Sequence, residues 1–509
     1  MIMKLDEYKN KVLGCWMGKN IGGTLGAPFE CKRGVFEFDF YTQEMSGEPL
    51  PNDDLDLQLV WLNAVEKYGR GTNSAILGEY WLSFITPNWS EYGAGKNNMR
   101  MGIVPPLSGY INNNNKDSCG AFIRSEIWAC LSPGHPEIAV EYAYEDAIVD
   151  HSREGVYGEV FFAALQSAAF VETDKYKLID IGLSYIPDNC GVTKGIKAVI
   201  KCYSTGLDWK QARITILNEV PGSFGMLGGY ENREPEVNVP IGPMGYDAPS
   251  NVAITILGWL YGEDDFGRSL CIAAGCGEDS DCTGATLGAI LGIIKGFEGI
   301  PEKWIKPLGR NIKTISINLC DGGISVPKTV DELTERVIRQ TPIFLGSQFC
   351  DTVNVEKGFN IYMNDSSNLI NSPRHINSYA SYNFLDKISR QPFCVSYDFT
   401  LFNVVLDYCD EPKVKDSQAK KFKLKIENNM RIQQWLTIRW FLPEGWIISP
   451  SIETCLLLEQ YHGNIGRAEV EFEIIPINLN QAKFDLVIEL SSNGRLSKGL
   501  IPVVLFNYM

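Results

Sequence analysis

The stretches Gly14-Cys-Trp-Met-Gly18-Lys-Asn-Ile-Gly22-Gly-Thr-Leu-Gly26 and Gly284-Ala-Thr-Leu-Gly288-Ala-Ile-Leu-Gly292-Ile-Ile-Lys-Gly296 both repeat glycine at every fourth position. A glycine inside a helix costs roughly 0.5–1 kcal/mol relative to alanine, so two stripes of four glycines need a compensating gain. Close approach of two helix backbones supplies that gain. Because Lys19, Asn20 and Lys295 interrupt these segments, the spacing predicts two tightly packed helices in a soluble bundle rather than a membrane pair.

Carboxylates cluster beside both glycine stripes. The clusters are Gly26-Ala-Pro-Phe-Glu30, Asn52-Asp53-Asp54-Leu-Asp56 and Gly277-Glu-Asp279-Ser-Asp281-Cys-Thr283. One short oxygen-bearing side chain is enough to cap a helix, so capping alone explains any single cluster. Several carboxylates buried together would raise one another's pKa unless a cation neutralised them. The number of clusters therefore favours a cation site, and oxygen ligands suit Mg²⁺, Mn²⁺ or Ca²⁺ better than zinc.

Composition limits the classes of protein that the chain can represent. It has 509 residues, of which 45% are hydrophobic and 21% charged, and its formal net charge is −16. One core rarely serves more than roughly 250–300 residues, so we expect at least two domains. The acidic balance disfavours nucleic-acid and anionic-membrane partners. A charged N-terminus and the lack of an apolar run of about 18 residues predict a cytoplasmic protein with reduced cysteines.

The pattern of apolar residues, and with it the predicted secondary structure, changes near residue 340. Before it, segments 54–68, 136–149 and 156–171 carry apolar residues at helical spacing. The Gly-, Pro- and Asn-rich connections 105–115 and 221–250 are long enough to be candidates for lining a pocket. After residue 340, short segments rich in β-branched and aromatic residues indicate a β-sandwich; these segments are 393–406, 422–427, 436–441, 468–475 and 484–490. We therefore expect an all-α domain over 1–340 and an all-β sandwich over 341–509.

The order of the three carboxylate motifs resembles that of the ADP-ribosylglycohydrolase family, over about residues 8–300. Gly22-Gly-Thr-Leu-Gly-Ala-Pro-Phe-Glu30 is similar to the family's Gly-x-Pro-x-Glu motif. Asn52-Asp53-Asp54 resembles its Thr-Asp-Asp motif, and Asp279-Ser-Asp281-Cys282 its Asp-x-Asp-Thr motif. The segment 436–446 resembles a hairpin of the Ig-like modules appended to many bacterial hydrolases. The resemblance implies a compact all-α catalytic domain that holds two Mg²⁺ or Mn²⁺ ions, followed by an Ig-like sandwich.

The family resemblance also implies roles for individual residues. It implies a metal-ligand set of Asn52, Asp53, Asp54, Asp279, Asp281 and Thr283. Glu30, Asp54 and Asp279 are the implied catalytic residues. The segment Ser118-Cys119-Gly120, which leads to Arg124, is similar to a glycine-rich loop that cradles a diphosphate through its backbone N–H groups. Tyr246 and Tyr230 could stack on a base.

Three functions are compatible with these features. The first is a metal-dependent glycosidase that cleaves an N- or O-glycosidic bond of an ADP-ribosylated or related ribosyl substrate, whether a small molecule or a conjugate. The second is a glycosidase for an ordinary sugar, and the third is a binding protein that keeps the fold without turnover. Retention of all four motif aspartates argues against the third. Asn52 and Cys282 stand where the family has threonine, and a thiol is a poor ligand for Mg²⁺. The sequence does not define an oligomeric state.

Overall fold

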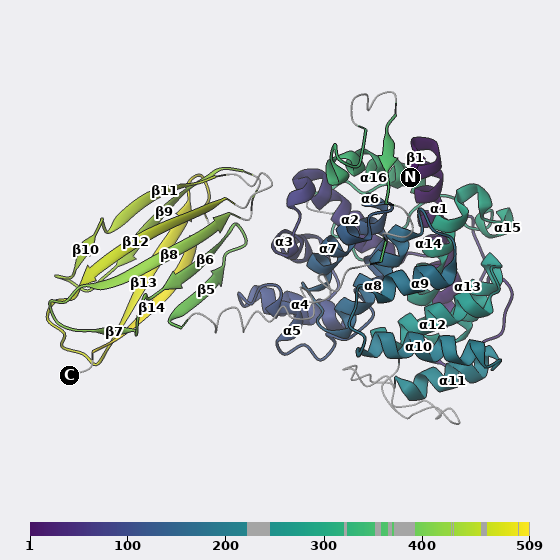
Figure 1. The fold of residues 1–509 in the computed structure, drawn as a ribbon, viewed down its shortest axis with the longest axis horizontal. Helices are drawn as coiled ribbons and strands as arrows, with labels where there is room; N and C mark the ends of the chain where they lie inside the picture. The colour runs from purple at the N-terminus through teal and green to yellow at the C-terminus, as the bar shows by residue number, and fades with distance from the viewer. Residues whose placement is uncertain are drawn as a thin grey trace. The chain divides into compact units, whose positions relative to one another are not determined.

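The structure, a computed structural model, describes residues 1–220, 245–319, 323–351, 358–364, 369–370, 392–428, 430, 432–459, 466–496 and 498–507. Internal contacts divide the chain into unit 1, Met1–Ser381, and unit 2, Tyr382–Met509 (Figure 1). This division falls later than the boundary expected at 340. The reason is that β1 (Ile2–Lys4) pairs with β4 (Asn360–Tyr362), which ties residues beyond 340 to the start of the chain.

Unit 1 is predominantly helical, as the sequence predicted. The described helices are α1 (Leu5–Gly26), α2 (Asp53–Tyr68), α3 (Ser74–Phe84), α4 (Ser90–Arg100), α5 (Leu107–Tyr110), α6 (Glu126–Leu131), α7 (Pro136–Ala147), α8 (Glu154–Ala168), α9 (Lys175–Leu183), α10 (Gly191–Ser204), α11 (Trp209–Glu219), α12 (Ala248–Tyr261), α13 (Phe266–Gly275), α14 (Ser280–Lys295), α15 (Glu302–Ile305) and α16 (Val330–Leu345). Short 3₁₀ helices are η1 (Ala27–Phe29), η2 (Gly69–Gly71), η3 (Phe122–Arg124) and η4 (Phe297–Gly299), and β2 (Lys32–Arg33) pairs with β3 (Gly277–Glu278). The three helices expected at 54–68, 136–149 and 156–171 are confirmed as α2, α7 and α8.

The two glycine stripes pack against each other, which confirms the predicted helix contact. They form facing sides of α1 and α14, whose ribbons run together in Figure 1. A Cβ added at Gly18 would overlap the backbone of Gly288, and one at Gly22 would overlap the backbone of Gly284. Both helices are buried along most of their length. This pairing fixes the register of α1 against α14 and thereby positions the residues at their ends.

Replacing Gly18 with alanine is therefore expected to destabilise the protein. The new methyl group would meet backbone atoms of Gly288, which cannot rotate away, and overpacking of this kind costs typically about 1–3 kcal/mol. Urea or thermal unfolding measures the change. Gly158→Ala on α8 is the matched control, because its Cβ would meet no atom nearer than 3.3 Å. Equal stabilities of the two variants would contradict the role of the stripe in backbone contact.

Unit 2 is a sandwich of two five-stranded sheets. The first has the order β10 (Ile447–Ser449), β12 (Arg467–Ile475), β8 (Lys420–Asn428), β6 (Phe402–Asp407) and β5 (Cys394–Asp398), and the second has the order β11 (Glu453–Leu458), β9 (Gln434–Phe441), β13 (Lys483–Ser492), β14 (Lys498–Asn507) and β7 (Lys413–Val414). Buried and less buried residues alternate along β8, as expected for a strand with one face in a core. Trp440 of β9 packs on Phe422 and Phe472 of the other sheet, with ring centroids 5.2 and 5.4 Å apart.

Two expectations for the sandwich need correction. Segment 393–406 is not one strand but a hairpin of β5 and β6, because Thr400 takes a positive φ of 66° at the turn. Segment 436–446 is not a hairpin either. β9 pairs with β11 and β13, whereas β10, which follows this segment, joins the other sheet. Alternating hydrophobicity shows where strands lie but not which neighbours they take.

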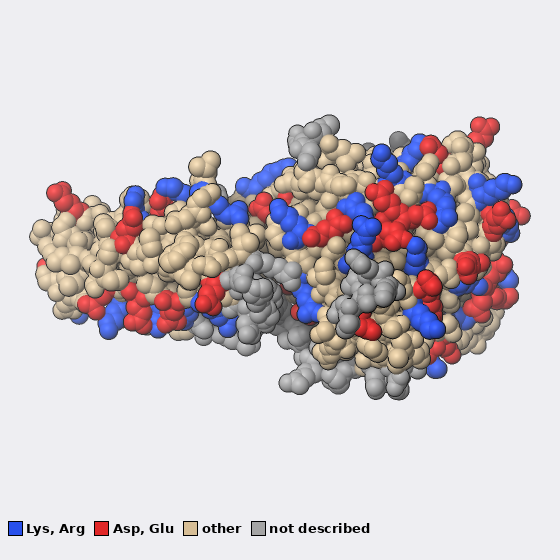
Figure 2. Space-filling view, turned by 90° about the horizontal axis from the view of Figure 1, so that it is seen from above, with Lys and Arg blue, Asp and Glu red and all other residues tan. Residues whose placement is uncertain are grey.

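One face of unit 1 is of mixed charge. On the face seen in Figure 2, acidic and basic side chains are interspersed. Within the described ranges, none of the helices is both long and apolar enough to cross a membrane. Of the two connections expected to line a pocket, 105–115 contains the short helix α5, and residues 221–244 of the other lie outside the described residues.

Candidate metal and catalytic site

Three helix ends meet in unit 1. α1 continues through η1 to Glu30, α2 begins directly after Asn52, and α14 begins directly after Asp279. Asn52 caps α2 by accepting the Asp54 amide at 2.8 Å, and its Nδ2 donates to Oδ2 of Asp281 at 3.3 Å. The N-termini of α2 and α14 therefore face one place, where their unpaired N–H groups favour negative charge.

Carboxylates and two thiols crowd this place. Their ligand atoms form three groups, within each of which the atoms lie no more than 4.8 Å apart: Glu30 with Asp279 and Asp281, Asp54 with Asp281 and Cys282, and Cys119 with Asp279 and Cys282. Asp54, Asp279 and Asp281 are 1, 3 and 5% exposed, and each has one buried oxygen that lacks a hydrogen-bond partner. Anionic oxygens buried in this way are costly unless a cation neutralises them. The donor set therefore suits a divalent cation.

Mutual repulsion and burial perturb the site's carboxyl groups. Burial raises the pKa of Asp54 and of Asp279 well above the ordinary range. Burial, with the charge of Asp281 as a second cause, raises the pKa of Asp53 to about 6. The charge of Asp281 is the main reason that the pKa of Glu30 rises to about 8. Without a cation, these groups hold protons at a pH at which carboxyl groups are normally ionised.

The raised pKa values predict a pH dependence of stability for the metal-free protein. A carboxyl group whose folded-state pKa is raised stabilises the fold below its unfolded pKa and loses that contribution as the pH rises through its folded pKa. The melting temperature in EDTA is therefore expected to fall between about pH 5 and pH 8, the window set by Asp53 and Glu30. Saturating Mn²⁺ is expected to stabilise the protein more at pH 8 than at pH 6. Melting curves that show the opposite order would contradict this account.

A buried lysine completes the charge pattern. Lys19, on α1, is 1% exposed and lies 3.1 Å from Glu126 and 3.7 Å from Asp54. Burial lowers its pKa, but the two carboxylates outweigh that effect and raise it. Gln58 donates to Glu126 at 2.9 Å. The ammonium group therefore holds Asp54 in place from the side of α1. Lys19 was interpreted from the sequence only as an interruption of the glycine stripe.

Two aromatic residues of the site were also missed. Tyr92, on α4, donates from its hydroxyl to Asp53 at 2.8 Å. Trp89, which precedes α4, is 51% exposed, and its ring stacks on Tyr92 with 6.3 Å between the centroids. No sequence motif marks either residue, because Tyr92 reaches Asp53 from a different helix and Trp89 is connected to Asp53 only through Tyr92.

The segment expected to bind a diphosphate, Ser118 to Gly120, contacts the carboxylate cluster through the Cys119 side chain. Ser118, Cys119 and Gly120 are all buried. The Ser118 hydroxyl lies 2.9 Å from Nε2 of His151, whereas the Cys119 thiol donates to Asp279 at 2.6 Å. The backbone amide of Cys119 donates to the carbonyl of Tyr246 at 2.6 Å, so it is already engaged within the protein.

Three other expected site residues have partners of their own. The Thr283 hydroxyl donates to the carbonyl of Ser280 within its own helix at 3.2 Å. Tyr246 is half-buried, and its hydroxyl contacts the Cys31 thiol, next to Glu30. Tyr230 lies outside the described residues. Arg124 is fully buried and pairs with Asp146 and Asp150, so its guanidinium serves the fold.

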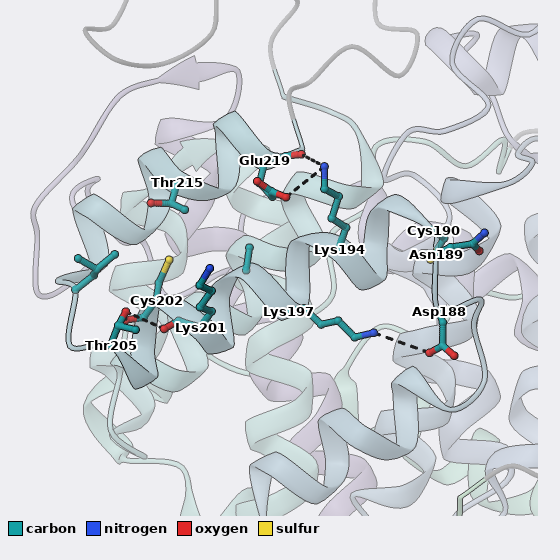
Figure 3. A pocket seen from close by; sticks show the side chains of 12 residues that line it. Asp188, Asn189, Cys190, Lys194, Lys197, Lys201, Cys202, Thr205, Thr215 and Glu219 are labelled. Atoms are coloured by element: carbon teal, nitrogen blue, oxygen red, sulfur yellow. Dashed lines mark hydrogen bonds and ion pairs between the residues drawn. The ribbon is translucent and has the colours of Figure 1, made fainter.

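A separate hollow of about 490 Å³ lies between α10 and α11 (Figure 3). Two lysines that line it are paired: Lys194 with Glu219 at 3.3 Å and Lys197 with Asp188 at 4.0 Å. None of the residues expected from the sequence to bind a substrate or metal lines this hollow. We therefore place the candidate site at the meeting of the helix ends.

The helical unit with carboxylates gathered at two helix N-termini defines a candidate hydrolase. A family model described as ADP-ribosylglycohydrolase matches residues 4–341, which is more than half of the chain. The chain therefore belongs to the ADP-ribosylglycohydrolase family, a family of hydrolases that cleave glycosidic bonds. This confirms the resemblance seen in the three motifs.

Two further comparisons, with solved structures and with curated proteins, add nothing to the family assignment. A solved structure described as an ADP-ribosylglycohydrolase-related protein complex is 18% identical to the chain, with a TM-score of 0.41, and the match covers 66% of this chain and all of that one. A comparison with curated proteins found no match.

Proposed function

We propose that this protein is a metal-dependent glycosidase that hydrolyses an N- or O-glycosidic bond of an ADP-ribosyl or related ribosyl substrate. One observation carries the proposal: Asp54, Asp279 and Asp281 are buried together at the meeting of two helix N-termini, and Asp279 and Asp281 each have an oxygen that accepts no hydrogen bond. Membership of the ADP-ribosylglycohydrolase family indicates that the bond hydrolysed is a glycosidic bond. The cation would be Mg²⁺ or Mn²⁺, and the overlapping groups Glu30–Asp279–Asp281 and Asp54–Asp281–Cys282 are compatible with two ions.

The aspartates would bind the metal ions, and Glu30 would transfer protons. Asp53, Asp54, Asp279 and Asp281 would hold the ions, which when bound supply Lewis-acid stabilisation of the reacting oxygens. Glu30 is exposed, and its pKa is raised to about 8, so it suits a general base or acid near neutral pH. It would accept a proton from the attacking water or return one to the leaving group.

The rim of the site suits a flat or ring-shaped substrate group. Trp89 presents an exposed ring that stacks on Tyr92, and the Tyr92 hydroxyl touches Asp53. An aromatic face so close to the carboxylates could stack a base or a sugar ring. Tyr246 would border the opposite end of the cluster, beside Cys31 and Glu30. These contacts favour a nucleotide-like substrate and are also compatible with an ordinary sugar.

Thermal-shift measurements test the proposal. We expect Mg²⁺ or Mn²⁺ to raise the melting temperature, EDTA to reverse the rise, and ADP-ribose to add a further rise only when the metal is present, because a ligand that binds the native state stabilises it by mass action. A response to free sugars but not to ADP-ribose or nucleosides would favour a glycosidase for an ordinary sugar. A melting temperature unaffected by either metal would refute the metal-dependent proposal.

A further inference from the structure

Two cysteines from distant parts of the chain meet at one end of the carboxylate cluster. Cys119 precedes η3, and Cys282 lies in the first turn of α14. Their sulfur atoms and one oxygen of Asp279 lie within 4.8 Å of one another. The Cys119 thiol donates to Oδ2 of Asp279 at 2.6 Å, and the Cys282 thiol donates to Asp54 at 3.3 Å. Both thiols are free and buried, at 3 and 7% exposure.

This donor set differs in chemistry from the rest of the cluster. Mg²⁺ and Ca²⁺ prefer oxygen ligands, whereas thiolates select softer cations such as Zn²⁺. Oδ2 of Asp279 accepts from the Cys119 thiol, whereas its other oxygen, Oδ1, is buried and accepts no hydrogen bond, so a cation bound by Asp279 would neutralise a carboxylate that the protein leaves partly unsatisfied. Its burial, at 3% exposure, leaves no access to bulk water that would solvate it.

The geometry is close to that of a zinc centre. Zn–S bonds of about 2.3 Å in a tetrahedron place two sulfurs roughly 3.8 Å apart. The two sulfurs lie no more than 4.8 Å apart, so they would have to approach each other by about 1 Å at most. The Cys119 sulfur, which is 2.6 Å from Oδ2 of Asp279, would have to move away from that oxygen, and side-chain rotation can make both changes. Three protein ligands would leave the fourth position open, as in zinc centres that bind water or substrate.

We propose that Cys119, Cys282 and Asp279 form a sulfur-containing site for a borderline-soft divalent cation of the Zn²⁺ class. This site lies beside the all-oxygen group of Glu30, Asp279 and Asp281 and shares Asp279 with it. The inference deepens the proposed function, on which it rests, by dividing the cluster into a sulfur-containing and an oxygen-only position. Cys282, where the family motif has threonine, would determine this preference.

Zinc binding to the full-length reduced protein tests this inference. Zn²⁺ would be supplied from a competing chelator, so that exposed thiols such as Cys409 and Cys455 do not load. X-ray absorption at the zinc edge is expected to show sulfur neighbours at about 2.3 Å. Cys282→Thr and Cys119→Ser are each expected to weaken Zn²⁺ binding at least roughly tenfold. Mg²⁺ binding should change less in both variants.

Controls separate the site from general effects. Cys202→Ser removes a buried thiol on α10 and should leave Zn²⁺ affinity unchanged. Wild-type Zn²⁺ affinity in both Cys119→Ser and Cys282→Thr, with both variants folded by circular dichroism, would overturn the inference. An X-ray absorption spectrum that shows only nitrogen and oxygen neighbours around zinc would also overturn it. So would a Cys119–Cys282 disulfide that resists reducing agents. The proposed function fails separately, if Mg²⁺ and Mn²⁺ do not bind, so the two failures can be told apart.

Discussion

Asp281→Asn is expected to weaken Mn²⁺ binding by at least about tenfold and to lower turnover further. Asp281 is 5% exposed, one of its oxygens has no partner, and its other oxygen accepts from Asn52. Asparagine has nearly the same size, and Asp281 lies within the first turn of α14 rather than at its N-cap, Asp279, so the helix should survive. One anionic ligand is lost, however, from a site that depends on charge. A reacting water that is neither activated nor positioned reacts far more slowly.

Isothermal titration with Mn²⁺ and urea unfolding measure the two parts of this prediction. The matched control is Asp265→Asn, the same chemical change at the exposed N-cap of α13, where Asp265 accepts from the Arg268 amide at 2.7 Å. We expect wild-type Mn²⁺ affinity in the control and similar unfolding free energies in both variants. Equal Mn²⁺ affinity for wild type and Asp281→Asn would remove Asp281 from the ligand set.

Arg124→Gln is expected to produce the largest loss of stability. The guanidinium is fully buried, donates to Asp146 at 2.8 Å and to Asp150 at 2.5 Å, and lies 3.9 Å from Glu159. Removing one partner of a buried ion pair typically costs about 3–5 kcal/mol, because the remaining charges stay buried without compensation. Here three carboxylates would lose their common cation, so the variant could fail to fold at 37 °C.

Unfolding of Arg268→Gln provides the comparison. Arg268 pairs with Glu263 on the surface at 2.9 Å, and exposed pairs of this kind contribute about 1 kcal/mol or less. Arg124→Gln should therefore unfold at much lower denaturant concentration than Arg268→Gln. Similar midpoints would show that the buried network does not support the fold. They would also reopen the possibility that Arg124 contacts a substrate.

Features that leave a pattern within a single helix could be predicted from the sequence, and most contacts between separate elements could not. The glycine stripes predict the α1–α14 contact because their four-residue spacing is a property of each helix alone. The carboxylate motifs likewise lie next to helix starts that the sequence marks. By contrast, nothing in the sequence connects Tyr92 to Asp53 or Cys119 to Cys282, since these contacts join separate elements.

Some interpretations from the sequence were incomplete for physical reasons. Lys19 interrupts an apolar stripe, and only the position of Glu126 on another helix shows that its charge is paired inside the protein. Thr283 as a metal ligand stays a prediction: its hydroxyl donates to the carbonyl of Ser280, which leaves the lone pairs of its oxygen available to a cation. The boundary expected at 340 ignored β4, because a three-residue strand that pairs with residues 2–4 leaves little trace in composition.

The central claim is tested most directly by measuring substrate hydrolysis by the protein with and without its metal. The protein would be stripped with EDTA and then incubated with ADP-ribosylated peptides, nucleosides and simple glycosides, with and without Mn²⁺ or Mg²⁺. We predict hydrolysis of at least one ribosyl substrate that requires the metal and is lost in Asp281→Asn. Hydrolysis that continues undiminished in EDTA, or no cleavage of any ribosyl substrate at saturating Mn²⁺ and Mg²⁺, would contradict the proposed function.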